Sequence, residues 1–334
     1  MKRMLAVIGS LVALLLGLVG ARMVLTAATA PSGAAVGVAG PTAAITPPKA
    51  TTLLATGAPA TPGSLVTAPG APVLVGAGDT ADCGEPHDEA SAALLDGIAG
   101  TVFTTGDNAY QDGSAAEFAE CYGPSWGRHR DRTRPAPGNH DYRTRDGAAY
   151  YDYFGAAAGD PGKGYYSYDL GTWHIVVINS NCGDVGCDEG SAQEQWLRAD
   201  LAQHPATCTL AYWHHPRFSS GKHGSQSKMQ AIWEALYDAG ADVVLTGHDH
   251  NYQRFAPLNA RGEVDPEQGI RQFVVGTGGK NLYQIDEPLA TTEVYNDDTF
   301  GVLRLTLHER SYDWEFIPVA GGTFSDSGSA ECHP

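Results

Sequence analysis

The stretch Asp242-Val-Val-Leu-Thr-Gly-His-Asp-His250 joins a short apolar run to two histidines that are separated by one residue. Short apolar runs bounded by glycine and polar residues are typical of buried strands. The stretch therefore predicts a strand over residues 242–246, with His248 and His250 just beyond its end. In open α/β sheets, ligands collect beyond the carboxyl ends of the strands. We expect the two histidines to belong to a ligand-binding site.

Other apolar runs lead into polar motifs in the same way. They are residues 72–76 before Asp79, 101–105 before Asp107 and 208–213 before His214. Because the carboxyl ends of neighbouring strands lie together, we expect these polar side chains to meet at one edge of a sheet.

Helical patterns lie between the runs. Ser191-Ala-Gln-Glu194 is a capping box that opens one helix, and residues 227–239 place apolar side chains on one helical face before Gly240. Alternating strands and helices indicate an α/β layered domain.

After Gln272 the helical patterns become rare. Apolar runs at 273–275, 302–307 and 312–318 predict an antiparallel set that closes a second sheet. The expected fold class is α/β, a layered β-sandwich of two mixed sheets flanked by helices.

The N-terminal part differs from the rest. Lys2 and Arg3 precede an uncharged apolar run, and Ala28-Thr-Ala30 offers a cleavage site, so residues 1–30 are typical of a secretory signal peptide. A retained membrane anchor stays an alternative, because the run is close to the shortest length that spans a bilayer. Residues 31–70 are rich in Ala, Pro, Thr and Gly and predict a disordered linker. Residues 71–334 then form a single folded domain.

Six cysteines follow the linker, and an even number in an exported chain indicates disulfides. Many pairings are open to six cysteines. Cys182 and Cys187 enclose a loop short enough to close locally. The simplest remaining choice pairs Cys83 with Cys121 and Cys208 with Cys332.

The formal net charge of −17 argues against affinity for nucleic acid or anionic lipid. It leaves a small phosphorylated substrate open, because bound cations reverse the local potential.

Five polar motifs occur in order and offer carboxylate, phenolate, amide and imidazole donors, the ligand types of two adjacent cations. They are Gly78-Asp79-Thr80, Gly106-Asp107-Asn108-Ala109-Tyr110, Gly138-Asn139-His140-Asp141, His214-His215-Pro216 and Gly247-His248-Asp249-His250. Each motif alone is common in turns, so their combination carries the prediction.

In this combination the chain resembles the calcineurin-like metallophosphoesterases, and within them the purple acid phosphatases of the secreted bacterial type. The superfamily usually opens with Asp-x-His, but here Ala81 stands where that histidine is expected. Tyr110, three residues after Asp107, stands where purple acid phosphatases carry a metal-binding tyrosinate. One ligand is thus exchanged for another at the same metal.

The resemblance implies a site for two metal ions that share Asp107. The first ion would be held by Asp79, Asp107, Tyr110 and His250, a hard anionic set that suits Fe³⁺. The second would be held by Asp107, Asn139, His214 and His248, a set that suits Zn²⁺, Mn²⁺ or Fe²⁺. His215 is an alternative to His214, but the family places the ligand two residues before Pro216. No other cofactor is expected.

The resemblance also implies roles in chemistry for His140 and Asp141, which would stabilise the transition state, and for His223, which would contact phosphate or protonate the leaving group. The expected reaction is hydrolysis of phosphomonoesters by attack of a metal-bound hydroxide. Two alternatives stay open: a phosphodiesterase or nucleotide hydrolase with the same site, and a secreted metal-binding protein without catalysis.

The protein is expected outside the cell, or anchored at its surface if the N-terminal segment is retained. The sequence leaves the oligomeric state undetermined.

Two basic motifs have simpler interpretations. Arginines alternate over residues 128–134, a pattern that favours a solvated face over a phosphate-binding one. Gly276-Thr-Gly-Gly-Lys280 is not a phosphate-binding P-loop, because Asn281 stands where serine or threonine is required.

Overall fold

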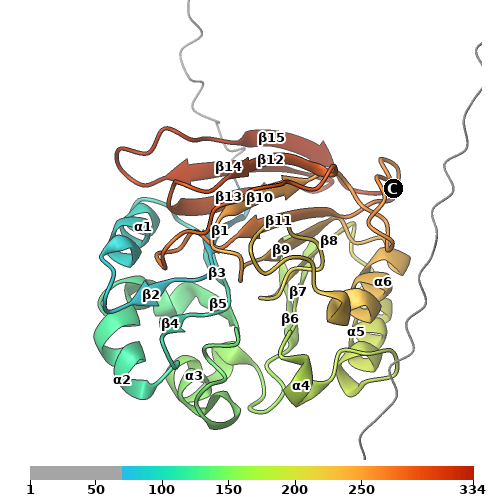
Figure 1. Cartoon of the computed structure of the whole chain (residues 1–334). Coiled ribbons are helices and arrows are strands. Elements are labelled where there is room, and N and C mark those ends of the chain that lie inside the picture. The colour runs from blue at the N-terminus through green and yellow to red at the C-terminus, as the bar shows by residue number, and fades with distance from the viewer. Residues whose placement is uncertain (1–69) are drawn as a thin grey trace, which may run out of the picture. The chain divides into compact units, whose positions relative to one another are not determined.

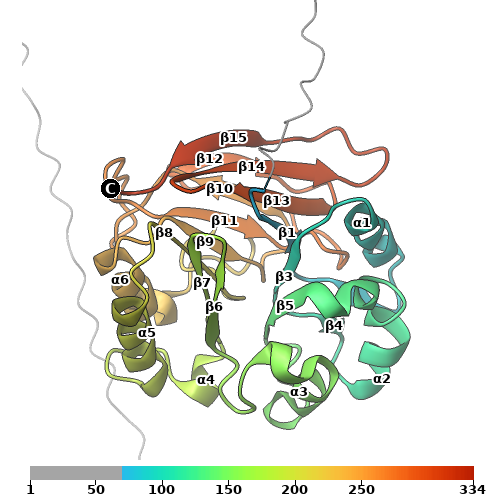
Figure 2. The same ribbon diagram turned by 180° about the vertical axis from the view of Figure 1, so that it is seen from behind.

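The computed structural model describes residues 70–334, shown in Figures 1 and 2. The predicted signal peptide (1–30) and all but the last residue of the predicted linker (31–70) lie outside the described residues. Among the described residues, none of the helices combines the length and the apolar character needed to cross a bilayer.

The described domain is built on two mixed sheets, as the sequence predicted (Figure 1). The first sheet has the strand order β15 (Ser327–Glu331), β14 (Ser311–Pro318), β13 (Gly301–Leu307), β1 (Val73–Ala77), β3 (Thr101–Thr105), β5 (Thr133–Ala136). The second has the order β12 (Thr292–Asn296), β10 (Tyr252–Phe255), β11 (Arg271–Val275), β9 (Val243–Thr246), β8 (Cys208–Tyr212), β7 (Trp173–Val177), β6 (Tyr166–Leu170). Strands β1, β3 and β5 pair in parallel, and so do β7, β8, β9 and β11, whereas the remaining pairs within these sheets are antiparallel.

Short elements complete the domain. The α-helices are α1 (His87–Asp96), α2 (Ala115–Glu117), α3 (Ala148–Phe154), α4 (Cys182–Val185), α5 (Ala192–Gln203) and α6 (Gln230–Asp238). Other helical turns are η1 (Phe118–Tyr122), η2 (Trp126–Arg132), η3 (Arg145–Gly147), η4 (Gly155–Ala158) and η5 (Ser227–Met229). The strands β2 (Ala81–Asp82) and β4 (Ala109–Tyr110) form a small parallel pair.

The core follows from the alternation of side chains along the strands. In β7, Ile175 and Val177 belong to the cluster that also holds Leu74 and Val102 of the first sheet, so these side chains fill the space between the sheets. Val176 belongs to a second cluster, in which side chains of α5 and α6 cover the opposite face of the second sheet (Figure 2). This layering agrees with the near-continuous burial of β7, β8 and β9.

One predicted grouping is wrong. The run at 273–275 was expected to join 302–307 and 312–318 in an antiparallel set, but β11 pairs in parallel with β9 and lies in the second sheet. Strands β13 and β14 instead extend the first sheet from β1. An apolar run that is buried on both faces of a sheet can pair with a parallel or an antiparallel strand. Its sequence therefore does not specify which strand it pairs with.

The predicted helices are present with small differences. The Ser191 hydroxyl accepts the Glu194 N–H, 3.2 Å away, and so caps α5. The Glu194 carboxylate reaches back to the N–H of Gly190 instead of Ser191, at 3.1 Å. The helix expected over 227–239 is divided into η5 and α6.

The three disulfides pair as predicted. They are Cys83–Cys121, Cys182–Cys187 and Cys208–Cys332, and none of the cysteines in the described part of the chain is free. The last of them links the start of β8, in the second sheet, to the residue after β15, in the first sheet.

All five motifs follow strands, including the one at Asn139. The sequence did not reveal β5, which contains Arg134 and Pro135 and lies at the edge of its sheet. The loops that follow the strands are tied together by backbone hydrogen bonds, such as Asp79 N–H to Gly106 O at 3.0 Å. The two sheets are joined there by Gly78 N–H to Val275 O at 2.9 Å. The motifs therefore meet at one end of the sandwich.

Candidate metal centre

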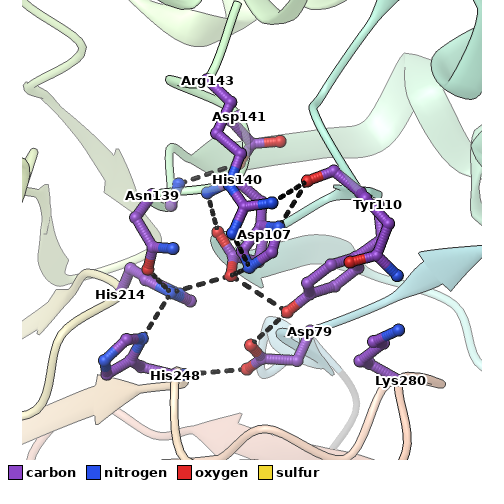
Figure 3. Close-up of polar contacts among 12 residues, drawn as sticks. Asp79, Asp107, Tyr110, Asn139, His140, Asp141, Arg143, His214, His248 and Lys280 are labelled. Atoms are coloured by element: carbon purple, nitrogen blue, oxygen red, sulfur yellow. Dashed lines mark hydrogen bonds and ion pairs between the residues drawn. The ribbon is translucent and has the colours of Figure 1, made fainter.

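Four donor atoms from four predicted ligands gather on one side of the site, and Figure 3 shows three of these ligands, Asp79, Asp107 and Tyr110. The phenol oxygen of Tyr110 lies 2.8 Å from Asp79 Oδ1, 3.0 Å from Asp107 Oδ2 and 3.3 Å from His250 Nε2. His250 Nε2 is in turn 3.3 Å from Asp79 Oδ1. All four side chains are buried.

A second group adjoins the first and shares Asp107 with it. His214 Nε2 lies 3.2 Å from Asp107 Oδ2, 3.1 Å from Asn139 Oδ1 and 3.2 Å from His248 Nδ1. Asp107 Oδ2 is therefore the common member of both groups, as a bridging carboxylate would be. The structure brings all seven predicted ligands together.

The donor chemistry of the second group fits a cation. His214 Nδ1 lies 2.8 Å from the Thr105 carbonyl, which can only accept, so Nδ1 carries a proton. Nε2 then offers a single lone pair in the neutral ring or a single N–H in the protonated ring, yet it faces two oxygen atoms and a second ring nitrogen. One nitrogen cannot satisfy three such neighbours by hydrogen bonding, whereas a shared cation can. His250 is oriented in the same way by the Asn281 carbonyl, 2.7 Å from its Nδ1.

The backbone of three predicted ligands lies in the left-handed region. Asp79, Asp107 and His248 have φ angles of 58°, 51° and 69°. Such angles are uncommon for residues other than glycine, and they concentrate at functional sites. The turns aim the three side chains inward directly after their strands.

Close packing fixes the Asn139 loop beside Asp107. A Cβ atom on Gly138 would lie 2.1 Å from Asp107 Oδ1. Only glycine leaves room for the two loops to approach this closely. The same carboxylate oxygen accepts the His140 N–H at 2.7 Å, which orients Asp107 within the site.

The buried charges influence one another strongly. Burial alone would raise the pKa of Asp107, but His214 and His140 hold this pKa well below its usual range. Burial alone would lower the pKa of His214, but Asp107 and Asp79 raise it to about 9. Burial and the charge of His214 lower the pKa of His248 to about 3. Burial alone would also raise the pKa of Asp79, but His250 and His214 lower it, so both carboxylates place negative charge where cations are expected.

Asp141 lies inside the fold and accepts hydrogen bonds from two loops of the site. Its carboxylate accepts N–H groups from Gly138 at 2.8 Å and from the Asn108 side chain at 2.9 Å, and it is fully buried. Burial and the charge of Asp107 raise the pKa of Asp141 to about 7. These contacts lock the Asp107 and Asn139 loops together, so the structure favours a positioning role for Asp141 over contact with substrate.

Three histidines that the sequence analysis considered, but did not assign as metal ligands, differ in their surroundings. His140 Nε2 lies 3.9 Å from Asp107 Oδ2, at the border of the donor groups. The His223 ring centroid lies 4.3 Å from that of His248, so His223 adjoins the second group as expected. His215 Nδ1 is hydrogen-bonded to the Ser180 hydroxyl, 2.8 Å away, and that hydroxyl also accepts the His215 backbone N–H at 3.0 Å. His214 is favoured over His215 as the ligand because its Nε2 lies beside the oxygen atoms of Asp107 and Asn139.

Several residues beside the site were not predicted. Tyr283 stacks on His250 with ring centroids 4.0 Å apart. Lys280 Nζ lies 5.1 Å from the Tyr110 ring centroid and pairs with Asp82. The Arg143 guanidinium lies beside His140. Of these, only Arg143 had a usable signal in the sequence, because it stands three residues after His140.

The arginines that alternate over 128–134 do not reach the donor groups. Arg128 pairs with Glu89 and Asp96, and Arg132 donates to the carbonyls of Leu95, Ile98 and Gly100. These contacts tie η2 to α1 and to the residues that follow it. The sequence predicted only that this segment faces solvent, and the structure shows that two of its arginines also hold neighbouring elements together.

Comparison with known proteins agrees with this geometry. The family model for calcineurin-like phosphoesterases matches residues 68–252, more than half of the chain. Purple acid phosphatase 21 of Arabidopsis thaliana is 31% identical over 159 residues, which cover 44% of this chain and 35% of that protein. Acid phosphatase A of Cryphonectria parasitica is 28% identical over 193 residues, which cover 49% of this chain and 38% of that protein. The matches thus span about a third of the length of these curated relatives.

A solved structure supports the fold. Purple acid phosphatase PPD1 from yellow lupin seeds superposes with a TM-score of 0.62 at 19% identity, over 78% of this chain and 54% of that one. At this identity the likeness concerns the fold alone. The family match shows that this chain belongs to the calcineurin-like phosphoesterase family, which implies a binuclear metal centre, and its similarity to the curated relatives makes it purple acid phosphatase-like within that family.

Proposed function

We propose that this protein is an exported two-metal phosphatase that hydrolyses phosphomonoesters. The observation that carries the proposal is the position of Asp107 Oδ2, which lies 3.0 Å from the Tyr110 oxygen and 3.2 Å from His214 Nε2. One carboxylate oxygen thus joins an anionic donor group to an imidazole-rich one, an arrangement suited to a metal pair.

The ligand sets suggest different ions at the two positions. Asp79, Asp107, Tyr110 and His250 would hold Fe³⁺, while Asp107, Asn139, His214 and His248 would hold Zn²⁺, Mn²⁺ or Fe²⁺. Bound cations supply Lewis acidity to phosphoryl oxygens and lower the pKa of water. The chain orients the ligands through the carbonyls of Thr105 and Asn281. His140 and His223 border the donor groups, where they would contact the phosphoryl group and the leaving group.

A Tyr110→Phe variant tests the first metal. Ligation of Fe³⁺ by a phenolate produces a visible absorption band, so we expect the purified wild-type protein to be coloured and the variant to lose the band. Tyr283→Phe is the matched control, because this ring stacks on His250 while its hydroxyl makes no recorded hydrogen bond among the described residues. Absorption spectra combined with iron analysis provide the measurement. Iron-containing wild-type protein without colour would contradict tyrosinate ligation.

Two chromogenic substrates separate the proposed activity from its nearest competitor. We expect the metal-loaded protein to hydrolyse an aryl phosphomonoester with a higher kcat/KM than the corresponding diester. Turnover of the diester alone would favour the phosphodiesterase alternative. Absence of turnover on both, with two metals bound per chain, would favour a metal-binding protein without catalysis.

Export is the second part of the proposal. Three disulfides fit an oxidising compartment, and the apolar N-terminal run in the sequence fits an export signal. Mass spectrometry of the native protein tests this assignment. Recovery from the culture medium without residues 1–30 would support secretion, full-length protein in the membrane fraction would indicate an anchor, and full-length protein in the cytosol would contradict export.

A further inference from the structure

We propose that Arg143 is a substrate-binding residue that grips phosphoryl oxygens and favours dianionic monoesters over monoanionic diesters. This inference rests on the proposed phosphatase function and deepens it. It assigns a specificity-determining role to a residue outside the five motif cores.

The first argument is position. Arg143 Nη2 lies 3.3 Å from His140 Nε2, and that nitrogen lies 3.9 Å from the bridging oxygen Asp107 Oδ2. Figure 3 shows the Arg143 side chain reaching along His140 toward the donor atoms. The His140 ring thus lies between the Arg143 guanidinium and the shared carboxylate, and the Arg143 side chain is partly exposed.

The second argument is the hydrogen bonding of His140. Its Nδ1 lies 2.5 Å from the Gln111 carbonyl, which can only accept, so Nδ1 is the donor. In the neutral ring Nε2 is then the acceptor for the Arg143 N–H. The Arg143 guanidinium is thus held against the edge of His140 that faces the donor atoms, where both side chains can meet one phosphoryl group.

The third argument is unused donor capacity. A guanidinium carries five N–H groups in a planar fork that matches phosphate geometry. Arg143 donates to the Gln111 carbonyl at 3.0 Å and to His140, and it lies 3.5 Å from Asp112 Oδ1. Its side chain remains 47% exposed and that of Asp112 67% exposed, so this ion pair is weak. The remaining N–H groups are free to meet an anion.

Charge explains the expected preference. A monoester presents more negative charge and more terminal oxygens than a diester, so a positioned guanidinium stabilises its complex more strongly. A purely structural role, in which Arg143 ties the Asn139 loop to Gln111, would affect both substrates equally.

The experiment compares Arg143→Gln and Arg143→Lys with Arg145→Gln in the metal-loaded full chain. Arg145 is a matched control in the same loop, because its side chain is 95% exposed and its one ion pair within the described part of the chain is with Asp146. We expect Arg143→Gln to lower kcat/KM about 10- to 100-fold for the monoester and clearly less for the diester. Arg143→Lys should restore part of the loss, and Arg145→Gln should match wild type.

A second readout does not depend on turnover. Calorimetric titration with inorganic phosphate should show weaker binding to Arg143→Gln, with two metals still bound and an unchanged Tm. Equal losses on both esters, or losses that follow the metal content or Tm, would overturn the assignment in favour of a structural tie. If the wild type hydrolyses neither ester, the proposed function fails, while the phosphate titration still tests Arg143.

Discussion

Replacing Asp107 with asparagine is expected to abolish stable binding of both metal ions and to lower kcat roughly 10³-fold or more. Asp107 Oδ2 is the atom that both donor groups share, so the substitution removes an anionic ligand from two cations at once. Elemental analysis of the purified variant, together with monoester turnover, provides the measurement. His214→Ala should have a similar effect at the second position.

Asp146→Asn supplies a closely matched control for this substitution. Asp146 has a φ angle of 53°, nearly the same as that of Asp107, and its side chain is 78% exposed. Both changes therefore place asparagine in a left-handed conformation that it tolerates. The control should keep its metals and activity. Full activity of Asp107→Asn with two bound metals would refute the proposed site.

Removing the Cys208–Cys332 disulfide is expected to have a large effect on the stability of the domain. Replacing Cys208 and Cys332 with serine should lower the free energy of unfolding by about 5 kcal/mol, against about 2 kcal/mol for the Cys182–Cys187 pair. The reason is loop closure, because the cysteines are separated by 124 residues in the first pair and by 5 in the second. The long-range bond restricts the unfolded chain far more.

Urea denaturation under non-reducing conditions gives both values. The Cys182→Ser/Cys187→Ser protein serves as the internal control, because it loses a covalent bond of the same kind. Similar midpoints for the two double variants would contradict the loop-closure argument. Cys208–Cys332 also joins the two sheets, so its loss should expose β15 before the rest of the first sheet.

Much of the candidate site was predictable, because motif residues follow apolar runs. Asp79, Asp107 and His248 each stand two residues beyond a strand, and a strand that ends in a tight turn leaves few places for the next polar side chain. The second group could be anticipated in the same way from His214. Asn139, which belongs to the same group, was predicted as a ligand from the resemblance alone. The strand before it, β5, contains Pro135, and proline is unusual within a strand, so the sequence did not predict a strand there.

Other features depend on contacts that no local pattern encodes. Tyr283 reaches His250 from a loop 33 residues further along the chain, and nothing in its neighbours distinguishes it from a packed aromatic. The partner of β11 is decided by how the chain returns from β10, because the residues of β11 are almost all buried. The resemblance gave Asp141 a role beside His140 in stabilising the transition state, yet its hydrogen bonds turn it inward.

The left-handed turns at Asp79, Asp107 and His248 set stability against function. Glycine would adopt these φ angles at little cost, whereas a carboxylate or imidazole residue stores conformational energy at each. Replacing these three residues with glycine would remove the conformational strain, so a chain selected for stability alone would not keep them. The domain therefore keeps a less favourable backbone at three residues whose donor atoms it holds in place before any ion arrives.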